Sequence, residues 1–227
     1  MKKFIAILSF MAVYNHVLAQ SASISQTRFI IDGGVSEVFI NNPAFNAWAG
    51  GSNIKNVNPG VSGFFDLAVA GKWDGDLHLS AANPFLDASF EFGKRLTRPN
   101  SPIASYINVD YGAFDAIFNN AVLPGYTLTP DQRGKQLQLR SSNDYIGLTS
   151  RNYLSRLQFY MGKRHHAIFT SGFYVTGGWM PFSKDWRYGY WTQDDADSST
   201  FHNVKAYDVP NINNFFVEGG VFVGVGF

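Results

Sequence analysis

The sequence predicts an all-β fold: a transmembrane antiparallel up-and-down β-barrel of eight strands, with ten strands as the alternative. Three observations support this class: a strictly alternating C-terminal strand, an export signal at the N-terminus, and few charged residues. Of the 227 residues, 15% are charged and 16% are aromatic, whereas roughly a quarter of a soluble domain is charged. The shortfall indicates either an unusually large core or a surface that meets lipid.

The C-terminal segment, residues 215–227, alternates between two kinds of residue. Its odd positions are mostly large and apolar, and its even positions are mostly small and include one acid, Glu218. Successive side chains of a strand point to opposite faces, so this strand has two different environments. In a membrane barrel these are lipid and lumen. We therefore expect Val223 to face lipid and Gly224 to face the lumen, where a serine would be tolerated.

Residues 1–19 have the features of a secretory signal peptide. Two lysines precede an apolar run, residues 4–13, and the small residue Ala19 ends the segment. The run is too short to span a bilayer. We expect residues 1–19 to be the signal peptide and residues 20–227 to form a barrel domain in the cell outer membrane.

Composition excludes several other classes. The chain has no cysteine, so disulfides do not stabilise it, and it has no apolar run long enough for a transmembrane helix. Besides the transmembrane helix, a closed β-barrel is the arrangement in which every backbone N–H and C=O group forms a hydrogen bond within the protein, as lipid requires. The net charge is +1, without the basic stripe typical of nucleic-acid binding.

Seven further segments alternate in the same way as the last one. They are residues 27–32, 64–73, 77–82, 86–92, 103–111, 156–161 and 167–179. Charged residues gather on the face opposite the aliphatic side chains: Arg28, Asp32, Asp66, Lys72, His78, Asp87, Glu91, Asp110, Arg156 and Glu218. We interpret this face as a narrow lumen in which both signs of charge pair. The alternative is the solvent face of a secreted soluble β-sandwich.

The connections are expected to be short at one end of the barrel and long at the other, as in outer-membrane barrels. The predicted short turns are Asp74-Gly75, residues 93–95 and residues 162–166; the predicted long loops are residues 35–59, 112–152 and 181–213. Asn83-Pro84 is an exception, because it is a short connection at the end of the barrel where the other connections are expected to be long. Residues 136–150 are ambiguous: they form either a hairpin above the membrane or two further strands.

The signal peptide and the closing strand together resemble those of small outer-membrane β-barrel proteins of Gram-negative bacteria. The resemblance is one of pattern over residues 20–227, and it singles out no particular protein. It implies outer-membrane lipid as the surroundings. It also implies that the barrel-assembly machinery reads the C-terminal strand that ends in Phe227.

The sequence points to no catalytic, cofactor-binding or metal-binding residue, and we predict that the protein is not an enzyme. His165-His166 is interpreted as part of a polar turn, and His78 as a hydrogen-bonded structural histidine in the lumen. Asp194, Asp195 and Asp197 lack the glycine-punctuated spacing of a calcium loop, which favours a solvated acidic loop.

Aromatic residues are dense from residue 179 to residue 191. Trp179 and Phe182 are predicted to belong to an interfacial girdle of a porin-like barrel. For Trp186 to Trp191 two interpretations stay open, the girdle or a contact surface for a partner or a glycan.

These observations favour a structural or surface-interaction role, because eight-stranded barrels have interiors largely filled by side chains. A narrow channel or transport accessory is the main alternative. A lipid-active enzyme would need a Ser or Asp beside a histidine at the lumen mouth, and the sequence offers none.

Overall fold

The computed structural model describes residues 28–51, 60–82, 85–99, 101–119, 138–161, 165–181, 185–195, 198–207 and 209–227. The predicted signal peptide lies outside these residues. The described elements are β1 (Arg28–Ile40), α2 (Pro43–Gly51), β2 (Val61–Ala70), β3 (Trp73–Ala82), β4 (Phe85–Arg95), β5 (Ala104–Asn119), β6 (Gln138–Met161), β7 (His165–Trp179), β8 (Arg187–Asp195), β9 (Ser198–Lys205) and β10 (Phe215–Gly226).

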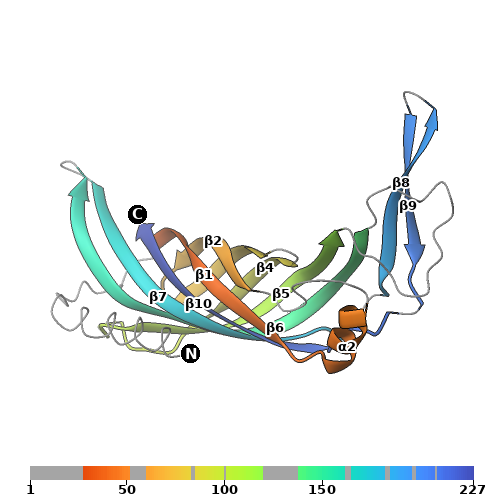
Figure 1. The fold of residues 1–227 in the computed structure, drawn as a ribbon. Coiled ribbons are helices and arrows are strands. Elements are labelled where there is room, and N and C mark those ends of the chain that lie inside the picture. Colours follow the sequence, from red (N-terminus) through yellow and green to blue (C-terminus); the bar gives the residue numbers. More distant parts are fainter. Residues whose placement is uncertain are drawn as a thin grey trace.

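Eight of the strands close into a barrel. The order around the barrel is β1-β2-β3-β4-β5-β6-β7-β10, every neighbouring pair is antiparallel, and β10 returns to β1. The C-terminal strand therefore closes the barrel against the first strand (Figure 1). The predicted eight-stranded all-β barrel is confirmed, and the ten-stranded alternative is wrong.

The ambiguous segment belongs to the barrel wall. β5 has 16 residues and β6 has 24, and the two pair from Ala104↔Tyr153 to Asn119↔Gln138. The prediction of a long loop over residues 112–152 is therefore wrong, because both strands continue through most of it. A register shift between Tyr153 and Ser155 marks a bulge in β6.

The tight turns are displaced from their predicted positions. The β2–β3 turn is Gly71-Lys72, and Asp74 and Gly75 lie within β3. β4 continues through residues 93–95, and β7 begins at His165 instead of after the predicted turn. Asn83-Pro84 does separate two adjacent strands, as expected. The Asp-Gly pattern was misleading here because Asp74 and Gly75 already pair with Ala70 and Val69 of β2. The chain therefore turns before Asp74.

The facing of the last strand is as predicted. In β10 the even positions are buried and the odd positions are exposed or half-buried. Val223 is 48% exposed, whereas Glu218 on the opposite face is 2% exposed. The expectation of a mild Gly224→Ser change is wrong, because a Cβ at Gly224 would lie 2.4 Å from the Cβ of Asp32.

Helix α2 lies in the predicted loop of residues 35–59, and sequence reasoning missed it. Asn42 precedes Pro43, and its carbonyl accepts a hydrogen bond from the Asn46 amide at 2.8 Å. Asn before Pro is a helix-start pattern, since Pro fits the first helical position. The side chain of Asn42 also accepts from the Asn213 amide at 2.5 Å, which ties the start of the helix to the segment before β10.

Strands β8 and β9 form a hairpin outside the closed barrel. β8 pairs with β6 at Gln138–Arg140, so the hairpin prolongs the barrel wall at the end that carries α2 (Figure 1). No helix in the described part of the chain is both long enough and apolar enough to cross a membrane.

The backbone of β10 lies so close to Gly34 that we expect no side chain to be tolerated at this position. A Cβ there would lie 1.9 Å from the carbonyl oxygen of Val221 on β10. We expect Gly34→Ala to lower the free energy of unfolding by about 1–3 kcal/mol, the usual cost of overpacking. The matched control is Gly177→Ala, whose Cβ would meet nothing within 4 Å. Urea unfolding of both variants measures this, and equal stability of the two would contradict the packing.

Candidate functional site

The lumen contains an ionic layer between two apolar clusters. One cluster includes Ile30, Ala70, Tyr106, Tyr153 and Phe222. The other joins α2 and the nearby connections to inward-facing strand residues, and includes Phe45, Phe118, Tyr145, Trp186 and Phe216. Ten Asp, Glu, His and Arg side chains of the described barrel residues are buried: Asp32, Asp66, Asp74, Asp76, His78, Asp87, Glu91, Asp110, Arg151 and Glu218. Eight of these ten are carboxyl groups, so acids far outnumber bases.

Arg151 on β6 is the centre of the ionic layer. Its Nη1 donates to Asp66 Oδ2 at 2.8 Å, and its Nη2 lies 3.4 Å from Glu91 Oε1 and in contact with Asp76. A further carboxylate, Asp32, lies 3.8 Å from Nη1. The guanidinium is fully buried, and such a charge is tolerable only when it is well paired.

Aromatic rings and neutral donors complete the surroundings of these charges. The Arg151 guanidinium lies 5.5 Å from the ring centre of Tyr174 and 5.6 Å from that of Phe222. Asn108 donates to Asp74 at 2.8 Å and to Glu91 at 3.1 Å. The Thr149 hydroxyl donates to Asp110 at 2.6 Å. The network therefore links all strands from β1 to β7.

His78 on β3 extends the network toward α2. Its Nδ1 lies 2.6 Å from Asp66 Oδ1, and an ionised carboxylate can only accept, so Nδ1 carries the proton. The other ring nitrogen, Nε2, has no hydrogen-bond partner among the described residues. The ring packs against Phe64 at 5.2 Å and Tyr174 at 5.4 Å, and these two rings also contact each other at 5.2 Å.

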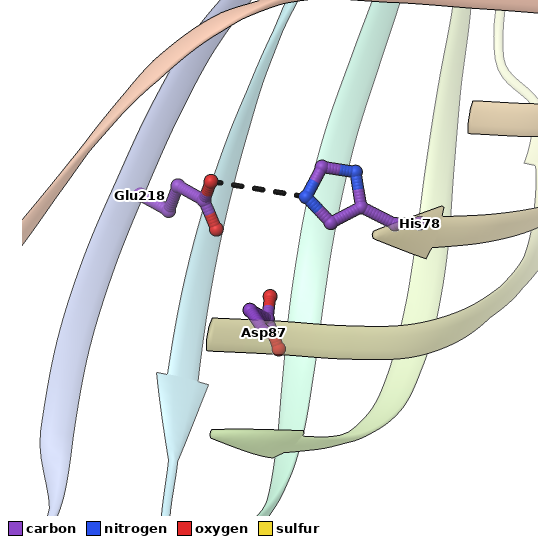
Figure 2. Close-up of side chains that lie close together, drawn as sticks. All are labelled: His78, Asp87 and Glu218. Carbon is purple, nitrogen blue, oxygen red and sulfur yellow. Dashed lines mark ion pairs between the residues drawn. The ribbon is translucent and has the colours of Figure 1, made fainter. Parts of the chain in front are cut away.

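Two carboxyl groups face Nε2 of His78, and Glu218 forms an ion pair with it. Glu218 Oε1 lies 3.8 Å from Nε2, across the gap shown in Figure 2, and Asp87 lies beside them. Glu218 accepts from the Tyr174 hydroxyl at 2.8 Å, and Asp87 accepts from the Tyr145 hydroxyl at 3.1 Å. One atom from each of the three side chains lies within 4.8 Å of the others. We call His78, Asp87 and Glu218 the lumen triad.

Most of the predicted inward charges lie where the alternation placed them. The buried members of the predicted set are Asp32, Asp66, His78, Asp87, Glu91, Asp110 and Glu218. Lys72 is a correction: it is exposed in the β2–β3 turn, so it does not reach the lumen. Arg28 is half-buried near the barrel end, and the side chain of Arg156 lies outside the described ones.

Sequence reasoning missed three inward charges, Asp74, Asp76 and Arg151. The two aspartates share the even parity of His78 along β3, so continuing the alternation backward would have found them. They were lost because Asp74-Gly75 was interpreted as a turn. Arg151 was lost because residues 112–152 were interpreted as a loop.

Two aromatic residues of the segment after β7 are interior. Trp179 is 45% exposed on the outer face, as expected for a girdle residue, but Trp186 is 1% exposed. The Trp186 ring stacks on Phe45 of α2 at 4.8 Å, and its Nε1 donates to the Pro210 carbonyl at 2.8 Å. With Tyr188 also buried, the contact surface suggested for Trp186 to Trp191 loses two of its aromatic residues. The predicted girdle residue Phe182 lies outside the described residues.

The other histidines and the acidic run fall in or beside strands. His165 and His166 begin β7, where they pair with Met161 and Tyr160. Asp194 and Asp195 belong to the end of β8 and not to an open loop; Asp197 lies outside the described residues. No family model, no curated protein and no solved structure matches this chain.

The pairing geometry predicts a large effect at Arg151. We expect Arg151→Met to reduce the free energy of unfolding by about 3–5 kcal/mol, because it leaves buried carboxylates uncompensated. Arg140→Met on the same strand is the control, since Arg140 is only half-buried and should change stability by less than about 1 kcal/mol. Denaturant unfolding in detergent measures both.

A double variant separates charge from packing. Adding Asp76→Asn to Arg151→Met should recover part of the lost stability, because one unpaired carboxylate is removed. A double variant that is less stable than Arg151→Met alone would show that charge pairing is not what Arg151 supplies.

Proposed function

We propose that this chain is an outer-membrane β-barrel protein with a structural or surface-interaction role and a lumen closed by its own side chains. One observation carries the proposal: the polarity of the barrel is inverted. Charged groups are buried inside, while the outer face is apolar. The exposed apolar residues of the barrel strands include Phe29, Phe39, Val61, Phe65, Val69, Trp73, Leu77, Leu86, Phe90, Phe92, Val109, Leu148, Val175, Trp179, Phe215, Val217 and Val223.

The outer face also has aromatic residues at both of its ends. Trp73 and Phe92 stack at 5.6 Å beside the β2–β3 turn, close to Lys94. At the end that carries α2, Trp179 and Phe215 lie 6.3 Å apart. Two aromatic belts separated by aliphatic residues are typical of proteins that cross a bilayer, because these rings favour the two interfaces.

The buried side chains inside the barrel support the structural role over the channel alternative. The apolar cluster around α2 lies at one end of the ionic layer, and the cluster around Tyr106 and Tyr153 lies at the other. Tyr106 also donates to the Gly71 carbonyl in the β2–β3 turn at 2.8 Å. An eight-stranded barrel has an interior just wide enough for such side chains.

The orientation of the surface can be tested with one substitution at two sites. Val223 on β10 is 48% exposed, and Val204 on the β9 hairpin outside the barrel is 43% exposed. We expect Val223→Arg to cost about 2–4 kcal/mol if the site lies near the bilayer midplane, and Val204→Arg to be nearly neutral. Recovery of the folded, heat-modifiable form from outer-membrane fractions measures both. Recovery of the wild type in the soluble periplasm would refute the membrane location.

The state of the lumen can be tested by electrical recording. Purified protein in planar bilayers should give at most small, rare conductance steps, because the charges pair across the lumen and apolar clusters lie on both sides. Large and steady steps would favour the channel alternative, with the same charged residues lining an open path.

A further inference from the structure

We propose that the lumen triad is a binding site for a divalent transition metal of the zinc class. The site would use His78 Nε2 and one carboxylate oxygen from each of Asp87 and Glu218. This inference does not depend on where the barrel resides, because it rests on the interior alone.

Two of the ligand atoms are buried without a hydrogen-bond partner. His78 Nε2 and Asp87 Oδ1 have no hydrogen-bond partner within the described residues, although their side chains are 2% and 5% exposed. Buried polar atoms without partners are rare, and each such atom calls for an unseen ion or water. In Figure 2 the imidazole nitrogen points toward Glu218, with Asp87 below the gap.

The histidine is oriented toward the triad. Asp66 accepts from Nδ1 at 2.6 Å, which directs Nε2 into the triad, where a bound metal would displace any proton that Nε2 carries. Metal-binding histidines commonly have this arrangement, with a carboxylate on the far nitrogen that fixes the tautomer and the ring. Phe64 and Tyr174 pack against the ring and Asp66 holds Nδ1, so little side-chain freedom is lost when a metal binds.

The distances between the three ligand atoms are close to those of a metal site. Two ligands about 2.1 Å from a tetrahedral ion lie about 3.4 Å apart. The separation of 3.8 Å between Nε2 and Glu218 Oε1 is too long for a hydrogen bond but close to this value. All three ligand atoms lie within 4.8 Å of one another, so small rotations of the carboxylates complete the geometry.

The negative charge of the triad carboxylates favours a bound cation. Arg151 compensates Asp66, Asp76 and Glu91, whereas Asp87 takes part in no ion pair with another described residue. A divalent cation would offset the negative charge of Asp87 and Glu218.

The donor set selects the kind of metal. Imidazole nitrogen is a preferred ligand of zinc and its neighbours in the transition series, whereas Ca²⁺ and Mg²⁺ prefer oxygen alone. Three protein ligands leave a fourth position for water in a tetrahedral site.

The test uses the full mature protein, folded in detergent, stripped with a chelator and titrated with Zn²⁺. Bound metal is measured after gel filtration. We expect one equivalent in the wild type, and at least a tenfold loss of affinity in Asp87→Asn and Glu218→Gln, which preserve shape. The matched control is Asp74→Asn, a buried lumen carboxylate outside the triad, which should bind like the wild type.

Three outcomes would overturn the proposal. They are absence of stoichiometric Zn²⁺ in folded wild type, unchanged affinity in both triad variants, and binding of Ca²⁺ or Mg²⁺ that Zn²⁺ does not displace. His78→Ala should abolish Zn²⁺ binding, but this variant can also disturb folding. The two isosteric variants, Asp87→Asn and Glu218→Gln, therefore decide whether the triad binds the metal. Their heat-modifiable mobility confirms that the barrel has closed in each sample.

Discussion

The packing of this barrel depends on one buried guanidinium. Arg151 extends from β6 to carboxylates on β1, β2, β3 and β4, so a single side chain joins opposite walls. A shift of one residue in any of these strands would turn its carboxylate outward, because side chains alternate. Buried ion pairs contribute little net stability compared with apolar packing, but leaving them unpaired is costly. We therefore infer that the network mainly selects the correct register of the strands.

The outer surface imposes the complementary constraint. A barrel with polar groups inside must place its apolar residues outside, and this arrangement is favourable only if lipid covers them. The proposed membrane location and the ionic lumen are thus two consequences of the same alternation. The size of the barrel adds a further constraint, because eight strands leave no room for both a full set of inward side chains and a wide pore.

The sequence predicted the fold and most of the lumen wherever the alternation was uninterrupted. In β10, and in β7 from Phe169 to Trp179, every outward position is apolar, small or aromatic, so the inward face, including Glu218, could be identified. The method failed where outward residues are also polar, as at Ser142 and Asp144 on β6. There both faces look alike, and Arg151 was assigned to a loop. Distances between strands decide which charges meet, so the lumen triad could not be derived from the sequence.

His78 shows how a structural role and a binding role can occupy the same side chain. One nitrogen donates to Asp66, as the prediction of a hydrogen-bonded histidine required, and the other nitrogen faces two carboxyl groups. Asp66 accepts from both His78 and Arg151, so the central network orients the histidine. The proposed metal site therefore depends on the same carboxylate that fixes the register of β2.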